Sequence, residues 1–158
     1  MKKSFFVIAI SVLLISGGFA QHLEIDRVPD AVKASLMNEF PKAMNQLWTL
    51  EGSTYQAMFS VGETKHAMKF DDTGKWIDKE TRISKTALPK EIISAITKNF
   101  AGYTIYEAEK VETPAKGMLY NVGIEKGKEI LEVHLSIKGV ILDKVSKQNK
   151  TDWGKNND

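Results

Sequence analysis

The 158-residue chain is 42% hydrophobic and contains no cysteine, which excludes an intrinsically disordered chain, disulfide bonds and zinc sites built on thiolates. Lys2 and Lys3 account for its formal net charge of +2, so the remainder is balanced between basic and acidic residues. A balanced charge argues against nucleic acid as a partner, because binding to phosphates requires a cationic face.

Residues 1–20 have the features of a secretory signal peptide. Lys2 and Lys3 form a basic start, Phe5–Ile15 is an almost uninterrupted apolar run, and small residues precede a cleavage point after Ala20. A retained membrane anchor is the alternative, but a spanning helix needs about 20 apolar residues and this run is shorter. We therefore expect a periplasmic or secreted protein, with no stable membrane insertion after cleavage near Ala20.

A helix is expected at two places in the chain. Val28-Pro29-Asp30 begins the first, because proline is tolerated in the first turn and an acidic residue suits the positive end of the helix dipole. Leu88-Pro89 begins the second in the same way. Apolar residues at a spacing of four then mark one face of each helix: Val32, Leu36 and Phe40 in the first, and Ile92, Ile96 and Phe100 in the second.

A pattern of alternating apolar and polar residues follows each expected helix. Tyr55–Asp78 and Tyr120–Asp143 share this pattern, and each contains a turn glycine before its last strand, Gly74 in one and Gly139 in the other. Such alternation is typical of strands with one apolar and one solvated face. We interpret the two stretches as copies of one sheet unit.

These patterns predict an α+β fold that is a tandem repeat of one helix plus about four antiparallel strands. The helices are expected to pack on one face of a curved antiparallel sheet and to leave the other face open to solvent or a partner. The expected boundaries are a signal peptide at 1–20, a first repeat at 21–84, a second repeat at 85–146 and a disordered tail at 147–158. Whether the two repeats form one continuous sheet is left open.

The sequence contains none of the motifs of common catalytic sites, such as Gly-x-Ser-x-Gly or His-Glu-x-x-His. We therefore expect no enzymatic activity, no cofactor and no metal. His66 lies among apolar strand residues and is predicted to be a packed core or rim residue rather than a ligand. Asp71 and Asp72 lack the alternating oxygen ligands of a calcium loop, so a hairpin turn is predicted there instead.

Aromatic and charged strand residues are the candidates for a contact surface, because such side chains dominate protein interfaces. Core packing is expected for Tyr55, Trp76 and Tyr120, which recur at apolar positions of the pattern. Trp48 is less plainly part of that core. The predicted partner-binding residues, on the face away from the helices, are Trp48, Met58, Lys69 and His134.

Several of these features resemble the PepSY-like domains of exported Bacteroidetes proteins, which are similar in fold to the beta-lactamase inhibitory protein. The resemblance is carried by Val28-Pro29 and Leu88-Pro89 at the helix starts, by Phe40-Pro41 and by the hairpin FDDTGK at Phe70–Lys75, and it covers about residues 25–146. It implies a single curved sheet with the helices behind it and a concave face in front. In that inhibitor the open face binds an enzyme, but fold analogy alone does not transfer this function.

The sequence therefore predicts a non-catalytic exported binding module that holds a protein or peptide on its open sheet face and inhibits or regulates a peptidase or other hydrolase. The alternative is a periplasmic carrier of a small hydrophobic or metal-containing ligand. A binding module predicts a broad, shallow surface with aromatic and charged residues, whereas a carrier predicts a closed apolar pocket. The sequence identifies neither the partner nor the oligomeric state.

Overall fold

The computed structural model describes residues 21–147 of the chain. The predicted signal peptide, and all but the first residue of the predicted tail, lie outside this range. The strands are β1 (Gln21–Leu23), β2 (Met44–Glu51), β3 (Thr54–Val61), β4 (Thr64–Phe70), β5 (Trp76–Arg82), β6 (Thr104–Thr113), β7 (Gly117–Lys126), β8 (Glu129–Ser136) and β9 (Ile141–Lys147). The helices are α1 (Asp30–Glu39) and α2 (Lys90–Asn99), with 3-10 turns η1 (Ile25–Arg27) and η2 (Lys85–Ala87) ahead of them.

All of these strands form one antiparallel sheet of nine strands in chain order. This topology overturns the predicted tandem repeat of one helix plus about four strands. β5 pairs directly with β6, from Lys79↔Glu112 to Arg82↔Glu109, so the described strands are not divided into two units. β1 is a further strand ahead of α1, whereas the predicted repeat has no strand before its helix. Alternating apolar residues identify a strand but not its neighbours in the sheet, which explains the error.

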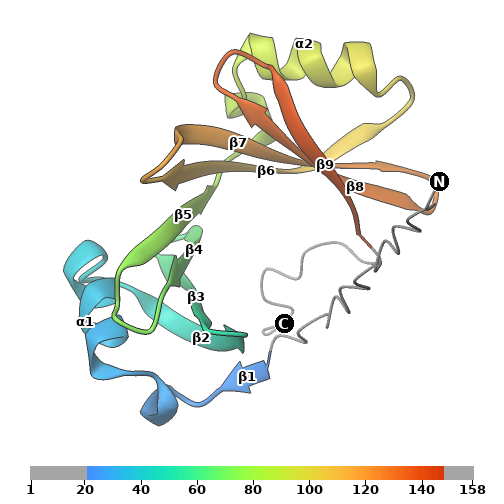
Figure 1. Cartoon of the computed structure of the whole chain (residues 1–158). Helices are drawn as coiled ribbons and strands as arrows, with labels where there is room; N and C mark the ends of the chain where they lie inside the picture. The colour runs from blue at the N-terminus through green and yellow to red at the C-terminus, as the bar shows by residue number, and fades with distance from the viewer. Residues whose placement is uncertain (1–20, 148–158) are drawn as a thin grey trace, which may run out of the picture.

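The sheet curves into an arch, with α1 and α2 on its outer side (Figure 1). The inner side carries no described helix, and we call it the open face. Because neighbouring side chains of a strand point to opposite faces, each strand contributes alternate residues to the outer core and to the open face.

Each helix begins and packs as its sequence predicts. Pro29 is the N-cap of α1 and Pro89 that of α2. Val32 and Leu36 are fully buried, as is Ile92, and each fully buried side chain of this size contributes about 1.5–3 kcal/mol. Two hydrophobic cores result, one between α1 and β2–β4 and one between α2 and β6–β8.

A hairpin turn also contacts each helix. Gly74 has φ of 86°, and a Cβ at this position would lie 2.6 Å from the carbonyl oxygen of Ala31 in α1. Gly139 has φ of 76° and is equally close to the carbonyl oxygen of Glu91 in α2. Glycine is therefore required twice over at both turns, by the left-handed backbone and by the close approach to the helix.

The predicted hairpin turn at Asp71 is confirmed. Its Oδ1 accepts hydrogen bonds from the backbone N–H of Thr73 at 2.9 Å and of Lys75 at 3.0 Å. These bonds lower the pKa of Asp71, with the largest effect from the Thr73 hydroxyl, which donates at 2.6 Å. The carboxylate is thus used to hold the turn.

The prediction that His66 packs in the core or its rim is also confirmed. His66 is 8% exposed and lies against the rings of Phe40 and Phe59, with Nδ1 3.2 Å from the Thr81 hydroxyl oxygen. Burial lowers the pKa of this histidine, so the neutral ring is favoured.

Candidate functional site: the open face of the sheet

Charged side chains of β4, β5 and β6 pair across the open face. Lys69 Nζ donates hydrogen bonds to Asp78 Oδ2 and Glu80 Oε1, both at 3.0 Å. Arg82 Nη1, on the same strand as these carboxylates, lies 3.1 Å from Glu107 Oε1 on β6. The three strands are thus joined by ion pairs on the side away from the helices.

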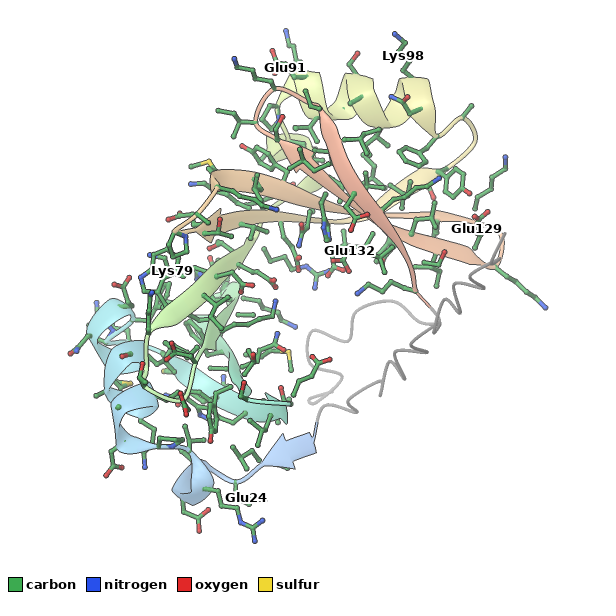
Figure 2. All side chains as sticks on the ribbon, in the orientation of Figure 1. Glu24, Lys79, Glu91, Lys98, Glu129 and Glu132 are labelled. Atoms are coloured by element: carbon green, nitrogen blue, oxygen red, sulfur yellow. The ribbon has the colours of Figure 1, made fainter. Side chains whose placement is uncertain are left out.

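A second group of charges lies on β8 and β9. His134 Nε2 is 2.9 Å from Glu132 Oε1, and Lys147 Nζ is 2.7 Å from Glu132 Oε2. Figure 2 shows Glu132 pointing into the hollow of the arch, whereas Glu91 and Lys98 project from α2 on the outer side. The strand register connects the two groups, because it places Arg82, Glu109, Asn121, His134 and Asp143 in one row from β5 to β9.

Two glutamates of β6 are unusually buried for charged residues. Glu107 is 5% exposed and Glu109 is 7% exposed, although no described helix covers this face. On the concave side of a curved sheet, side chains of neighbouring strands converge, and this convergence shields both carboxylates. Charged groups are rarely buried unless they are held by partners, and Arg82 contacts Glu107 here.

The ion pairs shift the pKa values of the groups that form them. Burial opposes the charge of Lys69, but the carboxylates of Glu80 and Asp78 outweigh it, so that its pKa is raised. The hydrogen bond from His134, together with Lys147, lowers the pKa of Glu132 to about 2, although burial acts in the opposite direction. The open face therefore holds fixed charges at neutral pH.

Tyr106 lies among these carboxylates because Gly123 leaves room for its ring. A Cβ on Gly123 would lie 2.6 Å from Tyr106 Cζ. A register irregularity in β6 between Ile105 and Glu107 accompanies this placement. Burial, with Glu107 as the strongest of the nearby charges, raises the pKa of Tyr106 to about 12. The phenol is therefore neutral and presents a hydroxyl to the open face.

The structure separates the four predicted partner-binding residues. Met58 and Lys69 lie on the open face of β3 and β4, and Met58 pairs with Ala67 two residues before Lys69. His134 is also on the open face, but on β8, with β5, β6 and β7 between it and Lys69. Whether these three residues contact a partner stays a prediction.

Trp48 requires a correction. It is 1% exposed and belongs to the core beneath α1, with its ring 6.2 Å from that of Phe70. The prediction that Trp48 lies on the open face is wrong, because its side chain points from β2 toward α1 and packs in that core. Its indole N–H donates to Gln46 Oε1 at 3.2 Å, which satisfies the buried donor.

Sequence reasoning did not single out most of the charged residues of this face. Glu107 and Glu109 flank the buried Ala108. Because successive residues of a strand point to opposite faces, this position in β6 could have placed both glutamates on the open face. The same alternation in β5 and β8 could have placed Arg82 and Glu132 on the open face. A curved sheet was expected, but no pattern in the sequence showed which charged side chains the curvature brings together.

Residues 21–147 also bear on other types of site. No group of three or more acidic or histidine side chains in this range is arranged to hold a metal ion. A shallow depression of about 510 Å³ lies where the β3–β4 turn meets the end of β5, lined by Glu63, Thr64, Lys65, Arg82, Ile83 and Ser84. Neither helix of the described range is long and apolar enough to cross a membrane.

Solved structures with the same fold come from Bacteroides species. A structure described as "a putative periplasmic protein" from Bacteroides eggerthii matches with a TM-score of 0.71 at 19% identity, over 79% of this chain and 93% of that one. A DUF2874 family protein from Bacteroides ovatus matches with a TM-score of 0.68 at 18% identity, over 78% and 91%. A BLIP-like protein from Bacteroides fragilis matches with a TM-score of 0.65 at 21% identity, over 78% and 90%.

No curated protein matches the chain. The family model described as "Putative beta-lactamase-inhibitor-like, PepSY-like" matches residues 53–143, which run from the start of β3 into β9 and make up more than half of the chain. The resemblance to this family is thereby confirmed, and the chain belongs to the PepSY-like, beta-lactamase-inhibitor-like family.

Proposed function

We propose that this chain is a non-catalytic binding module that holds a protein partner against its open face. The observation that carries the proposal is the division of the sheet into two sides: α1 and α2 cover the outer side, and the inner side is left with a band of charged residues (Figure 1). A sheet face that only had to be soluble would carry separate, well-solvated charges. Here the charges are linked in two groups, one across β4, β5 and β6 and the other across β8 and β9.

The linked charges favour recognition because they hold their side chains in fixed positions. Lys69 is held by two carboxylates, and Glu132 is held by His134 and Lys147. A partner that binds such groups loses less side-chain entropy than one that must order them. Their mixed signs would select a partner of complementary pattern and would reject others.

The comparisons support a periplasmic location and a hydrolase as the class of partner. One structural neighbour is described as a periplasmic protein, and the family is named after its likeness to a beta-lactamase inhibitor. Together with the signal peptide predicted at residues 1–20, these likenesses favour an exported module that inhibits or regulates a peptidase or other hydrolase. The likeness lies in the fold, and the identity of the hydrolase is a matter for experiment.

The same geometry does not favour the carrier of a small ligand. The depression lined by Glu63, Lys65 and Arg82 is shallow and polar, whereas a carrier encloses most of its ligand in an apolar pocket. The charged open face supports the protein-binding role, and this is the role we propose.

The test compares two double variants in capture experiments from an envelope extract of the organism that carries the gene. Lys69→Ala/His134→Ala removes one polar side chain from each half of the open face. The matched control, Glu91→Ala/Lys98→Ala, removes two exposed charges from α2 on the outer side. We expect a specific protein to be captured by the wild type and the α2 variant, and to be lost by the open-face variant, with all three proteins folded by circular dichroism. Retention by the open-face variant, or loss by the α2 variant, would contradict the proposal.

A further inference from the structure

The strand at the C-terminal end of the sheet, β9, has one edge without a partner strand in residues 21–147. β9 pairs with β8 on one side, and the order of the described strands ends there. It is seven residues long, whereas β1 at the other end of the sheet has three. A strand edge of this length presents a row of backbone donors and acceptors that another chain can pair with.

The side chains of β9 are exposed and include apolar ones. All residues from Leu142 to Ser146 are exposed, with Leu142 at 48% and Val145 at 39%. On the open face, Asp143, Val145 and Lys147 follow one another, because they pair with His134, Glu132 and Ile130 of β8. The apolar residue thus lies between an acidic and a basic one.

This order of residues is complementary to its own reverse. In a two-fold antiparallel pair, a residue faces its own copy at the axis, and residues at equal distances on either side face each other. With Val145 at the axis, Asp143 of one copy faces Lys147 of the other, twice. Lys144 then faces Ser146, so its charge meets no like charge.

Neighbouring registers lack this complementarity. An axis at Lys144 would place two lysines opposite each other, and an axis at Asp143 would place two carboxylates opposite each other. Like charges directly opposite in a sheet are destabilising, whereas opposite charges and apolar pairs stabilise it. A register shifted by one residue would set the open face of one copy against the helix-covered face of the other. The charges of β9 therefore select the register centred on Val145.

We propose that two copies of this chain pair through β9, antiparallel and with Val145 on the two-fold axis. The two sheets then continue into one another, and both open faces lie on the same side. Asp143, Val145 and Lys147 of both copies come to the middle of the combined face. This pairing does not depend on the binding function proposed above.

The test uses the lack of cysteine in the chain, because a single introduced cysteine can form only an intermolecular disulfide. Val145→Cys should give a disulfide-linked dimer on a non-reducing gel, since directly opposite Cβ atoms in a sheet are about 4.5–5.5 Å apart. Leu142→Cys is the control: this position is more exposed than Val145, but it lies three residues from the axis and so roughly 20 Å from its copy. Equal cross-linking of the two variants would overturn the proposal.

The mass in solution and a charge exchange complete the test. The wild type should form a dimer as its concentration is raised, and a mass that stays monomeric up to about 1 mM would overturn the proposal. Asp143→Lys should weaken the dimer about tenfold, because both of its cross-strand pairs become repulsive. Asp143→Lys/Lys147→Asp should recover part of the lost affinity, since the exchanged charges again face opposite partners, although the new carboxylate at position 147 also lies near Glu132. A dimer that is indifferent to Asp143→Lys would also overturn it.

Discussion

Glu132 is a residue whose charge depends strongly on folding. The side chains of His134 and Lys147 hold it, and its pKa falls from an ordinary value of 4.5 to about 2. A carboxyl group whose pKa is lowered by folding stabilises the protein above the unfolded value, and this stabilisation is lost as the pH falls through the folded value. Between pH 4.5 and about 2, the free energy of unfolding should therefore decrease as Glu132 is protonated.

This prediction is tested by measuring the free energy of unfolding of the wild type and of Glu132→Gln by urea denaturation at several pH values. Other carboxylates also titrate in this range, so the difference between the two proteins is the informative quantity. The wild type should lose stability relative to the variant as the pH falls below 4.5. A difference that is constant over this range would show that Glu132 is not held as described.

Individual residues also show where the sequence ceased to be informative. His66 and Asp71 were placed correctly, because their neighbours in the chain determine their surroundings. Trp48 was misplaced, because its face is set by the direction of β2 relative to α1 and not by its immediate neighbours. Glu107 and Glu109 were overlooked, because their burial comes from curvature of the sheet, to which distant residues contribute.

At the scale of elements, the close contact between the β4–β5 turn and α1 can be tested by substitution of Gly74. Gly74→Ala would place a methyl group 2.6 Å from the Ala31 carbonyl oxygen and would also strain a backbone with φ of 86°. Gly62→Ala is the matched control, since it has φ of 60° but open space around the new Cβ. We expect about 1–2 kcal/mol of destabilisation from backbone strain alone in the control, and a larger loss at Gly74.

The comparison is made by thermal or urea denaturation of both variants. Equal losses at the two glycines would mean that the β4–β5 turn does not press against α1.

The helix α2 offers a second matched pair of substitutions, because Ile92 and Ile93 are neighbours in the chain but differ in exposure. Ile92 is fully buried and Ile93 is 39% exposed. Ile92→Ala should reduce the free energy of unfolding by about 2–5 kcal/mol, through lost burial and the cavity left behind. Ile93→Ala should change it by about 0.5 kcal/mol or less, as expected of surface substitutions. The reverse order would show that α2 packs on a different face.

The elements themselves could be predicted from local patterns, whereas their assembly could not. Both helices begin after the prolines, and their apolar stripes are buried as predicted. The alternating strands are present too. That β5 pairs with β6, so that nine described strands form one sheet, depends on contacts between residues far apart in the chain, and the predicted tandem units were wrong for this reason.

For the molecule as a whole, the proposed function depends on the difference between the outer side of the arch and its open face. The outer side is closed by helices and contributes stability, while the open face contributes fixed charges and an aromatic hydroxyl at Tyr106. A protein partner should therefore contact residues of the open face and no residue of α1 or α2. This expectation concerns geometry and does not require the partner to be known in advance.

The most direct measurement places a photo-reactive amino acid at one of two methionines and asks which one cross-links to the captured partner. Met58 lies on the open face of β3, and Met37 is 42% exposed on α1. If the partner binds the open face, a covalent adduct should form from position 58 and none from position 37. Cross-linking from position 37, or a complex that forms without any adduct at position 58, would contradict it.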